Sequence, residues 1–294
     1  MTLNNNSEKL PHLKTIGIVL KPNSSDLKEF FLQAKGYFES IDCQVIIDKN
    51  SANTIGVDGV EFDDMCNQSD LIVSIGGDGT LISVIRRSFG FAKPILGVNL
   101  GNLGFLTDIM PNKLENFIQN LHNDNYKIDD IAIFEATIIH EDGSTDNIIS
   151  ANDIVINRKD FTHMINLKAS IDGYEFNNYY GDGLIVSTPT GSTAYNLSCG
   201  GPLVFPQTNA LIITPICPHS LTQRPMVLPE GFEVEFNTKD EKGAIVIADG
   251  QDIYDLGKND ILKIKIAQKR AKLLHHKDRN YFEIVNKKLN WGDK

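Results

Sequence analysis

One short segment of the chain has the residue types that phosphate chemistry needs. Residues 76–80 read Gly-Gly-Asp-Gly-Thr and follow the apolar run Leu71–Val73. Glycine lets the backbone approach a ligand closely, and a strand that passes through a glycine-rich turn into a helix often holds phosphate on its N–H groups. Asp78 would repel phosphate, so we expect it to act on a proton or a metal ion, as when a carboxylate accepts the proton of an attacking hydroxyl. A plain turn is the alternative, because Asp and Gly are common turn residues.

This segment matches neither of the two common phosphate-binding motifs. The P-loop requires Lys and then Ser or Thr after its last glycine, and the chain contains no such sequence. The dinucleotide motif requires a third glycine three residues after Gly79, where this chain has Ile82. Magnesium would therefore have to supply the positive charge that the P-loop lysine would give.

A second segment is rich in hydroxyl groups. Between Ser187 and Ser198, seven of the twelve residues carry a hydroxyl. Small donors and acceptors around one aromatic side chain, Tyr195, suit a polyhydroxylated ligand such as a nucleoside, whose base can stack on the ring. The alternatives are a polar surface loop and, for Tyr195, a place in the core. A third cluster, residues 150–153, reads Ser-Ala-Asn-Asp, and an Asn-Asp pair is more often a turn or a cap than a ligand contact.

Strand and helix patterns alternate in the first half of the chain. Apolar runs typical of buried strands occur at residues 14–20, 44–47, 71–75 and 94–100. Apolar residues at helical spacing occur at residues 27–38, 81–85 and 113–121. This alternation predicts an α/β domain with a Rossmann-like parallel sheet covered on both faces. It places the glycine segment between a strand and a helix.

From about Tyr126 the pattern changes to short β-like runs. Two runs flank Asp172-Gly173, which is a strong hairpin signal. The runs occur at residues 165–171, 174–180, 211–214, 232–236, 244–248 and 261–266. The second half is therefore expected to be mostly β, as a sandwich or a barrel.

Two domains are expected from this change of pattern. Residues 1–126 would form the α/β phosphate- and nucleotide-binding domain, and residues 127–277 the β-rich domain. The last segment, 278–294, has a helical pattern at 278–289 and is expected to pack back on the first domain.

Composition excludes several classes of partner. The net charge of −10 argues against nonspecific binding to nucleic acid or to an anionic membrane. The N-terminal residues are polar, and no apolar run approaches the roughly 18 residues that span a bilayer. The four cysteines are widely spaced and form no Cys-x-x-Cys pair, which indicates a reducing compartment rather than disulfides or zinc. A soluble, cytoplasmic protein without a resident metal site is expected.

Taken together, these segments resemble the NAD kinase family. The resemblance covers nearly the whole chain and rests on GGDGT at 76–80, NLGNLGFLTD at 99–108, Asn-Asp at 152–153 and DGLIVSTPTGSTAYNLSCGGP at 182–202. The last segment is highly specific, whereas the glycine segment also occurs in diacylglycerol-type lipid kinases and phosphofructokinases. The resemblance implies an α/β and a β domain with the site between them. It also implies transfer of the terminal phosphoryl group of ATP to the 2′-hydroxyl of the adenosine ribose of NAD, which gives NADP.

The resemblance also implies roles for individual residues. Asp78 stands at the position of the catalytic proton acceptor. The loop around the reacting phosphates corresponds to Gly76, Gly77, Gly79 and Thr80. The NAD-binding positions correspond to Asp78, Gly79, Asn152, Asp153, His163, Tyr180, Asp182, Thr193, Ala194, Tyr195, Asn196, Leu197, Ser198 and Gln251. Among these, His163 can instead be a packed side chain, and Gln251 can belong to a hairpin turn.

Two departures from the family pattern affect the expected NAD contacts. Asp153 stands where the family usually has Glu, and its shorter side chain shortens the reach to the ribose hydroxyls. Tyr180 stands where Arg is frequent, which removes a cation near the dinucleotide and bears on the choice between NAD and NADH.

The resemblance further implies that NAD and ATP are the substrates and that a divalent cation, magnesium, binds together with ATP. It also implies that the protein forms a homodimer or a homotetramer. Two alternative functions remain at this stage. One is a lipid kinase of the diacylglycerol type, which shares the fold and the glycine loop. The other is a non-catalytic NAD sensor, for which Asp78 would not be needed.

Overall fold

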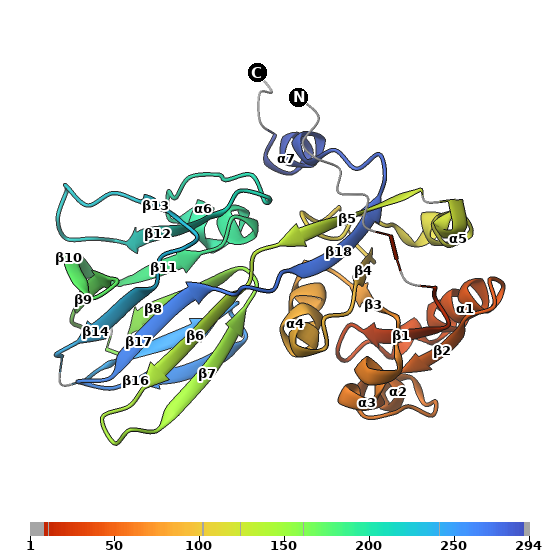
Figure 1. Cartoon of the computed structure of the whole chain (residues 1–294), viewed down its shortest axis with the longest axis horizontal. Coiled ribbons are helices and arrows are strands. Elements are labelled where there is room, and N and C mark those ends of the chain that lie inside the picture. The colour runs from red at the N-terminus through yellow and green to blue at the C-terminus, as the bar shows by residue number, and fades with distance from the viewer. Residues whose placement is uncertain are drawn as a thin grey trace. The chain divides into compact units, whose positions relative to one another are not determined.

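The structure is a computed structural model that describes residues 9–10, 12–101, 103–123, 125–160, 162–240 and 242–290. The chain folds into two compact units (Figure 1). The first unit comprises Met1–Asp130 and Ala271–Lys294, and the second comprises Ile131–Arg270. The fold is therefore built from a chain that leaves the first unit once and returns to it.

A six-stranded sheet, in the order β2-β1-β3-β4-β18-β5, forms the centre of the first unit. Every pairing among β2, β1, β3, β4 and β18 is parallel, which confirms the expected Rossmann-like sheet. The strands are β1 (Thr15–Leu20), β2 (Gln44–Ile47), β3 (Leu71–Gly76), β4 (Ile95–Asn99), β5 (Tyr126–Ile131) and β18 (Ala271–His276).

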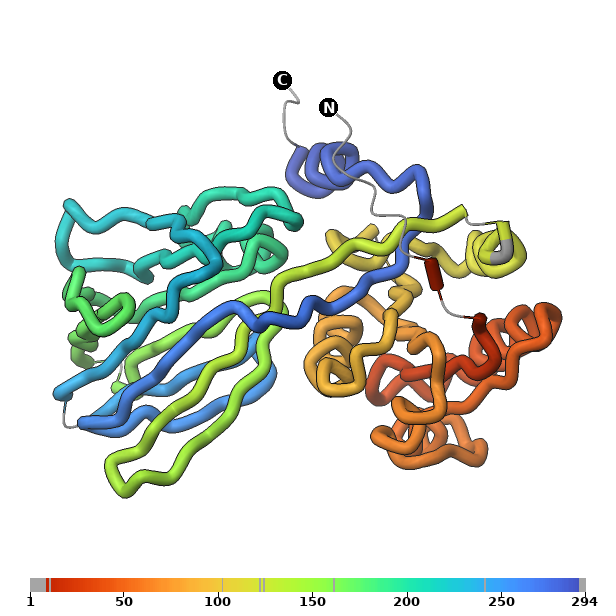
Figure 2. The backbone as a smooth tube through the Cα atoms, in the orientation of Figure 1, coloured from red at the N-terminus to blue at the C-terminus, as the bar shows by residue number. Residues whose placement is uncertain are grey.

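The strand β18 lies within residues 127–277, the range expected for the second domain, but it joins the sheet of the first unit. It pairs in parallel with β4, through Leu273 and Leu274, and so belongs to the first unit. Figure 2 shows the blue C-terminal tube entering the sheet of the first unit beside the yellow-green β5. The predicted β-like runs ended at residue 266, and a strand pattern does not in any case indicate which sheet the strand joins.

The described part of the first unit contains six α-helices. They are α1 (Lys28–Glu39), α2 (Lys49–Ile55), α3 (Phe62–Gln68), α4 (Asp78–Ser88), α5 (Pro111–Gln119) and α7 (Tyr281–Leu289), with 3₁₀ turns at Ser25–Leu27, Phe89–Phe91 and Leu121–Asn123. The sequence patterns did not predict α2 and α3, because both are short and polar. The N-cap of α2 is Asp48, whose carboxylate accepts hydrogen bonds from the N–H groups of Asn50 and Ser51.

Two six-stranded sheets form the second unit, in the orders β10-β9-β14-β17-β6-β7 and β13-β12-β11-β8-β15-β16. All their pairings are antiparallel. The strands are β6 (Phe134–Ile139), β7 (Thr145–Ser150), β8 (Asp153–Arg158), β9 (Ile165–Ile171), β10 (Tyr174–Gly181), β11 (Gly183–Ser187), β12 (Ala210–Ile216), β13 (Met226–Pro229), β14 (Val234–Thr238), β15 (Ala244–Ala248), β16 (Asp252–Leu256) and β17 (Ile261–Ile266).

One apolar core joins these two sheets. It contains Phe134 and Phe236 from the first sheet, and Ile156 and Val186 from the second, all fully buried. Alternate residues of each strand thus point inward, as in a β-sandwich, which confirms a sandwich rather than a barrel.

The predicted hairpin of the second unit is also confirmed. Strands β9 and β10 pair on either side of Asp172-Gly173, and both turn residues have positive φ, 49° and 82°. A two-residue turn of this kind favours Asp-Gly because Gly and, to a lesser degree, Asp tolerate positive φ.

Candidate functional site

The glycine segment lies between β3 and α4, as the sequence predicted. β3 ends at Gly76, Gly77 is the N-cap of α4, and Asp78 is the first residue of the helix. Gly77 has no side chain that could occupy the helix N-terminus, and the space beside it is open, since a Cβ there would meet nothing within 4 Å. The helix N-terminus carries a partial positive charge that favours anions, and here a carboxylate already lies beside it.

The Asp78 carboxylate is held by a second loop. Its Oδ2 accepts a hydrogen bond from the N–H of Phe105, at 2.7 Å. Its Oδ1 accepts from the N–H groups of Leu106 (3.2 Å) and Thr107 (2.9 Å), and from Thr107 Oγ1 (2.7 Å). These donors belong to the segment at 99–108, one of the segments that resemble the NAD kinase family. The structure describes this segment except for Asn102. The two segments therefore form one site.

Two glycines allow this close packing. A Cβ on Gly104 would lie 2.2 Å from Asp78 Oδ1 and 2.3 Å from Thr107 Oγ1. A Cβ on Gly76 would lie 2.3 Å from Thr80 Oγ1. Gly104 and Gly76 thus serve the packing of Asp78 and Thr80, and Gly76 is itself buried.

In the second unit, the Asn-Asp segment is organised by a residue that the sequence did not single out. Asp249 accepts hydrogen bonds from the N–H groups of Ala151 (2.8 Å), Asn152 (2.7 Å) and Asp153 (3.0 Å), and from Ser150 Oγ (2.8 Å). Asp249 adopts positive φ, 51°, at the turn between β15 and β16. The positive φ fits the Asp-Gly turn that precedes Gln251, but nothing in the sequence indicated which segment that carboxylate would hold.

Asp153 is one of the few buried acids in the described part of the second unit. It begins β8 and is 5% exposed. Burial, and then the negative charge of Asp249, raises the pKa of Asp153 to about 7. A group with this pKa can exchange a proton near neutral pH.

The hydroxyl-rich segment packs directly on the Asn-Asp segment. It contains a 3₁₀ turn (Thr190–Thr193) and the short helix α6 (Tyr195–Ser198), where the sequence patterns predicted only a loop. Thr188 Oγ1 donates to the carbonyl of Ala151, at 2.7 Å, and a Cβ on Gly191 would lie 2.1 Å from the Asn152 carbonyl.

Two polar atoms in these segments lack a partner. Asn152 Oδ1 and Thr190 Oγ1 are buried and accept no hydrogen bond from any described residue. Unsatisfied buried polar groups are rare in folded proteins and often mark a ligand or ordered water.

The six residues 193–198 divide by exposure. Asn196 is fully buried, and its side chain is used inside the loop: Nδ2 donates to the carbonyls of Ser192 and Pro202, and Oδ1 accepts from Thr214 Oγ1. Tyr195 and Ser198 are exposed, whereas Thr193, Ala194 and Leu197 are half-buried. Tyr195 is therefore a surface aromatic and not a core residue.

The remaining site residues of the second unit lie at strand ends and turns. The side chain of Asp182 pairs with Arg158 of β8, with Nε 3.2 Å from Oδ1. Arg158 thus places a cation beside Asp182, in a chain that has Tyr180 instead of Arg two residues earlier. Nothing in the sequence indicated this pairing, because the two residues are brought together only by the pairing of β8 with β11.

His163 and Gln251 are exposed. His163 Nδ1 is hydrogen-bonded to Thr162 Oγ1 at 2.7 Å, so it is not a packed core side chain. Gln251 lies in the turn between β15 and β16, where its N–H donates to the Ala248 carbonyl at 2.9 Å. The Tyr180 ring contacts His219, with centroids 5.7 Å apart.

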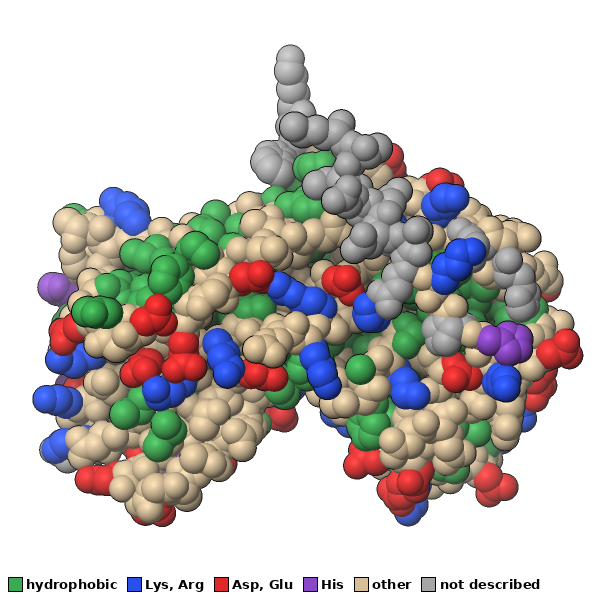
Figure 3. Space-filling model, in the orientation of Figure 1, with side chains coloured by type: hydrophobic (Ala, Val, Ile, Leu, Met, Phe, Trp, Pro, Cys, Tyr) green, Lys and Arg blue, Asp and Glu red, His purple; other side chains and the backbone are tan. Residues whose placement is uncertain are grey.

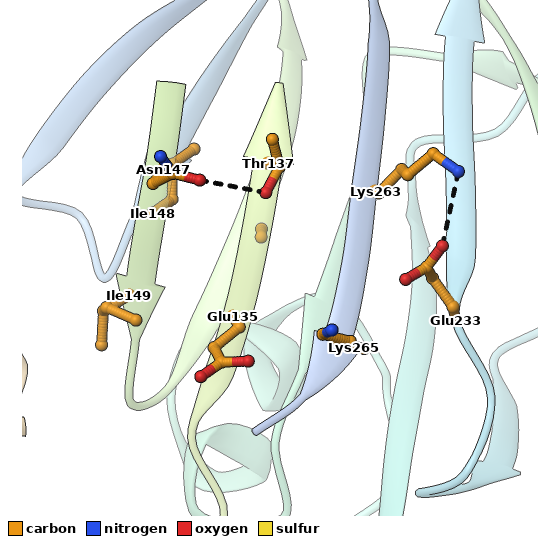
Figure 4. A pocket seen from close by; sticks show the side chains of 9 residues that line it. Glu135, Thr137, Asn147, Ile148, Ile149, Glu233, Lys263 and Lys265 are labelled. Carbon is orange, nitrogen blue, oxygen red and sulfur yellow. Dashed lines mark hydrogen bonds and ion pairs between the residues drawn. The ribbon is translucent and has the colours of Figure 1, made fainter. Parts of the chain in front are cut away.

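A pocket of about 310 Å³ lies elsewhere, on the face of the sheet formed by β7, β6, β17 and the start of β14 (Figure 4). Its polar lining consists largely of internal pairs, Thr137 with Asn147 and Lys263 with Glu233. None of the predicted site residues lines this pocket, so its chemistry is separate from theirs.

Two properties of the described residues bear on whether the chain could bind nucleic acid or a membrane. Acidic and basic side chains are interspersed on the face shown in Figure 3, without a continuous basic area there. No helix in the described ranges is long and apolar enough to cross a bilayer.

Comparison of the sequence with known proteins identifies relatives that share both domains of this chain. The chain matches the family models of the ATP-NAD kinase N-terminal domain over residues 16–126 and the ATP-NAD kinase C-terminal domain over residues 151–276. It is 48% identical to an NAD kinase of Wolinella succinogenes over 286 residues, which cover 97% of this chain and 98% of that protein. It is 45% identical to an NAD kinase of Sulfurimonas denitrificans over 281 residues, 96% of this chain and 98% of that protein.

Solved structures show the same fold. A yeast NADH kinase complexed with NADH superposes with a TM-score of 0.87 at 25% identity, covering 96% of this chain and 89% of that one. An NAD kinase from Archaeoglobus fulgidus in complex with ATP superposes with a TM-score of 0.74 at 24% identity, covering 94% and 98%. With both family domains present and nearly half of all residues shared with curated relatives over nearly its full length, the chain belongs to the NAD kinase family, and its activity is that of an NAD kinase.

Proposed function

We propose that Asp78 accepts the proton of the 2′-hydroxyl of the adenosine ribose of NAD as that oxygen attacks the terminal phosphorus of ATP. The new bond joins the ribose oxygen to phosphorus, the bond to the bridging oxygen of ADP breaks, and the products are NADP and ADP. The hydrogen bonding of Asp78 carries this assignment. Three donors approach Oδ1 and one approaches Oδ2, and since each carboxylate oxygen can accept about two hydrogen bonds, Oδ2 keeps a position for the substrate hydroxyl.

The same loop would hold the phosphates of ATP. Gly77 and Gly79 have open space where a Cβ would lie, and the N-terminus of the eleven-residue helix α4 favours negative charge. Gly76 and Thr80 pack against each other and set the shape of the turn. This leaves backbone N–H groups, rather than a lysine, as the phosphate ligands of this chain.

A divalent cation fits this site as a companion of the nucleotide. The described residues contain no group of three or more His, Cys, Asp or Glu that could hold a metal, whereas ATP phosphates offer oxygen ligands of their own. We propose that magnesium arrives with ATP and offsets the repulsion between the phosphates and Asp78. Removal of divalent ions by chelation is then expected to abolish NADP formation, and full activity after complete removal would refute the requirement.

The adenosine of NAD is assigned to the hydroxyl-rich segment of the second unit. The unsatisfied Asn152 Oδ1 and Thr190 Oγ1 would accept hydrogen bonds from the ligand, and the exposed Tyr195 ring would stack on the base. Asp153 and Asp182 would meet the ribose hydroxyls and the dinucleotide. Asn196 supports the loop from inside, and Thr193, Ala194, Leu197 and Ser198 line it. His163, Tyr180 and Gln251 are proposed as further contacts, as the resemblance implies.

The decisive experiment measures turnover and NAD affinity on one variant, Asp78→Asn. It is expected to lower turnover by about 10²–10⁴, the usual contribution of a general base, with little change in the dissociation constant of NAD. Thr107→Val is the matched control, because it removes one hydrogen bond to Oδ1 but keeps the carboxylate, and a loss within about tenfold is expected. Asp78 would be a binding residue instead if turnover survived and NAD affinity collapsed.

We also propose a cytoplasmic homodimer or homotetramer, as the resemblance implies. The edge strand β13 exposes Met226 and Val227, and an exposed apolar edge strand is a common place for chains to pair. Light scattering on the purified protein would give the mass in solution, and a monomer at micromolar concentration would exclude this proposal.

A further inference from the structure

The last segment of the chain reaches the loop that holds Asp78. β18 ends at His276, and a turn, in which the Arg279 N–H donates to the His276 carbonyl at 3.0 Å, leads to Asn280. Asn280 is the N-cap of α7, with its side chain accepting from the Phe282 N–H. A strand and a capped helix therefore fix Arg279 from both sides.

Arg279 contacts the Phe105 backbone directly. Its Nη2 donates to the Phe105 carbonyl at 2.6 Å, whereas the Phe105 N–H donates to Asp78 Oδ2. Phe105 thus connects the Arg279 guanidinium to the Asp78 carboxylate, because its carbonyl binds the first and its N–H binds the second. A shift of the Phe105 carbonyl would move the following peptide N–H groups, which also bind Asp78.

Arg279 is in turn held by a buried group of charges within the same unit. Its Nη1 lies 3.2 Å from Asp129 Oδ2, and its Nε lies 3.6 Å from Asp108 Oδ2. His275 Nδ1 is 3.0 Å from Asp108 Oδ1. All four side chains are at least 89% buried, and a buried arginine needs carboxylate partners such as these to offset the cost of its desolvation.

Asp108 extends this group to the other end of the same loop. It directly follows Thr107, which gives Asp78 two of its hydrogen bonds. Burial alone would raise the pKa of Asp108, but the charge and hydrogen bond of His275 and the charge of Arg279 outweigh it and lower the pKa. Residues 105 and 108 are therefore both anchored, so the donors between them cannot move freely.

A second contact comes from α7. The Lys288 ammonium lies 5.6 Å from the centroid of the Phe105 ring, within the range of a cation–π interaction. The C-terminal segment thus holds Phe105 by its backbone and by its ring.

We propose that the C-terminal segment of the chain, through Arg279 and its partners Asp108, Asp129 and His275, positions the Asp78 carboxylate for catalysis. These are positioning residues, since the contacts lead to Asp78 and not to a substrate. The proposal rests on the role of Asp78 assigned above. It predicts that the chemistry of the glycine segment depends on residues that lie about 200 positions later in the chain.

The test is a double-mutant cycle with Asp78→Asn and Arg279→Ala. Arg279→Ala alone is expected to lower turnover about 10–100-fold, the cost of misplacing a reacting group by about an ångström, with the NAD dissociation constant unchanged. In the Asp78→Asn background, the same substitution should cost little more, because its effect passes through that carboxylate. Added guanidinium should restore part of the turnover of Arg279→Ala, and an unrestored loss would contradict the positioning role.

Arg270→Ala is the matched control. Arg270 is likewise an arginine paired with a carboxylate, Glu230, but its side chain is less buried, at 24% exposed, and it lies in the second unit. Turnover within about twofold of the parent is expected. Arg279→Lys keeps the charge but not the planar fork, and it carries the same cycle if Arg279→Ala does not fold. Lys288→Met, at an exposed position, should lower turnover a few-fold.

The outcomes separate the two proposals. If Asp78→Asn retains turnover, the assigned role of Asp78 is wrong. If Asp78→Asn loses turnover while both Arg279 variants keep it, or if the losses add in the double variant, the positioning role alone is overturned.

Discussion

Replacement of Asp153 by Asn is expected to change how stability depends on pH. Asp153 is buried at the start of β8, and its pKa is raised from 3.8 to about 7, first by burial and then by Asp249. Between these two values the folded state binds the proton and the unfolded chain does not. The folded state therefore loses stability as pH rises from about 4 to about 7.

The size of this effect follows from the two pKa values. Integration of the linkage relation between about pH 5 and about pH 8 gives about 2.5 kcal/mol of lost unfolding free energy. Asn has nearly the same shape as Asp but no proton to lose. The difference in unfolding free energy between Asp153→Asn and the parent should thus shift by about 2.5 kcal/mol in favour of the variant over the same range.

Urea denaturation of both proteins at about pH 5 and about pH 8 measures this difference. Asp255→Asn is the control, because Asp255 is an exposed acid in the same unit and should show no such shift. If the unfolding free energies of Asp153→Asn and the parent differ by the same amount at both pH values, Asp153 is already ionised in the folded protein at about pH 5. Burial would then not raise its pKa to about 7.

Three further changes test other parts of the site. Gly104→Ala would push a Cβ to 2.2 Å from Asp78 Oδ1 and should lower turnover about 10²-fold, whereas Gly90→Ala, where a Cβ meets nothing within 4 Å, should leave it unchanged. Asp249→Ala removes the acceptor of four hydrogen bonds and should lower the free energy of unfolding by about 3–5 kcal/mol, read from urea titrations; a loss below about 1 kcal/mol would contradict its clamping role. The pKa of His140 is raised by hydrogen bonds to two carboxylates. His140→Gln should therefore destabilise the protein below about pH 6.5, and progressively less above the raised pKa. Thermal melts across this pH range measure the destabilisation, and a destabilisation that grew with pH would contradict the prediction.

Much of the secondary structure could be predicted from the sequence, because it depends on the types and spacing of neighbouring residues. The hairpin at Asp172-Gly173 formed as expected because its two-residue turn needs positive φ at both positions. The strands at residues 44–47, 244–248 and 261–266 match the structure residue for residue, since each is a continuous or alternating apolar run. Short polar helices such as α2 and α3 lack any such run, so they were missed.

The placement of β18 was decided only by the tertiary structure. A parallel strand can join any sheet with a free edge or gap, and its own residues do not indicate which one. Once Leu273 and Leu274 pair with β4, the chain that follows returns to the first unit, and Arg279 can reach Phe105.

The functional site divides in the same way. The sequence singled out Asp78, the hydroxyl-rich segment and the family, because these depend on residue types at fixed spacing. It did not show that Phe105 to Thr107 hold Asp78, or that Asp249 holds a segment 97 residues away from it at Asn152. Most of these donors are backbone N–H groups, which every residue except proline carries, so only the folded chain decides which of them a carboxylate meets.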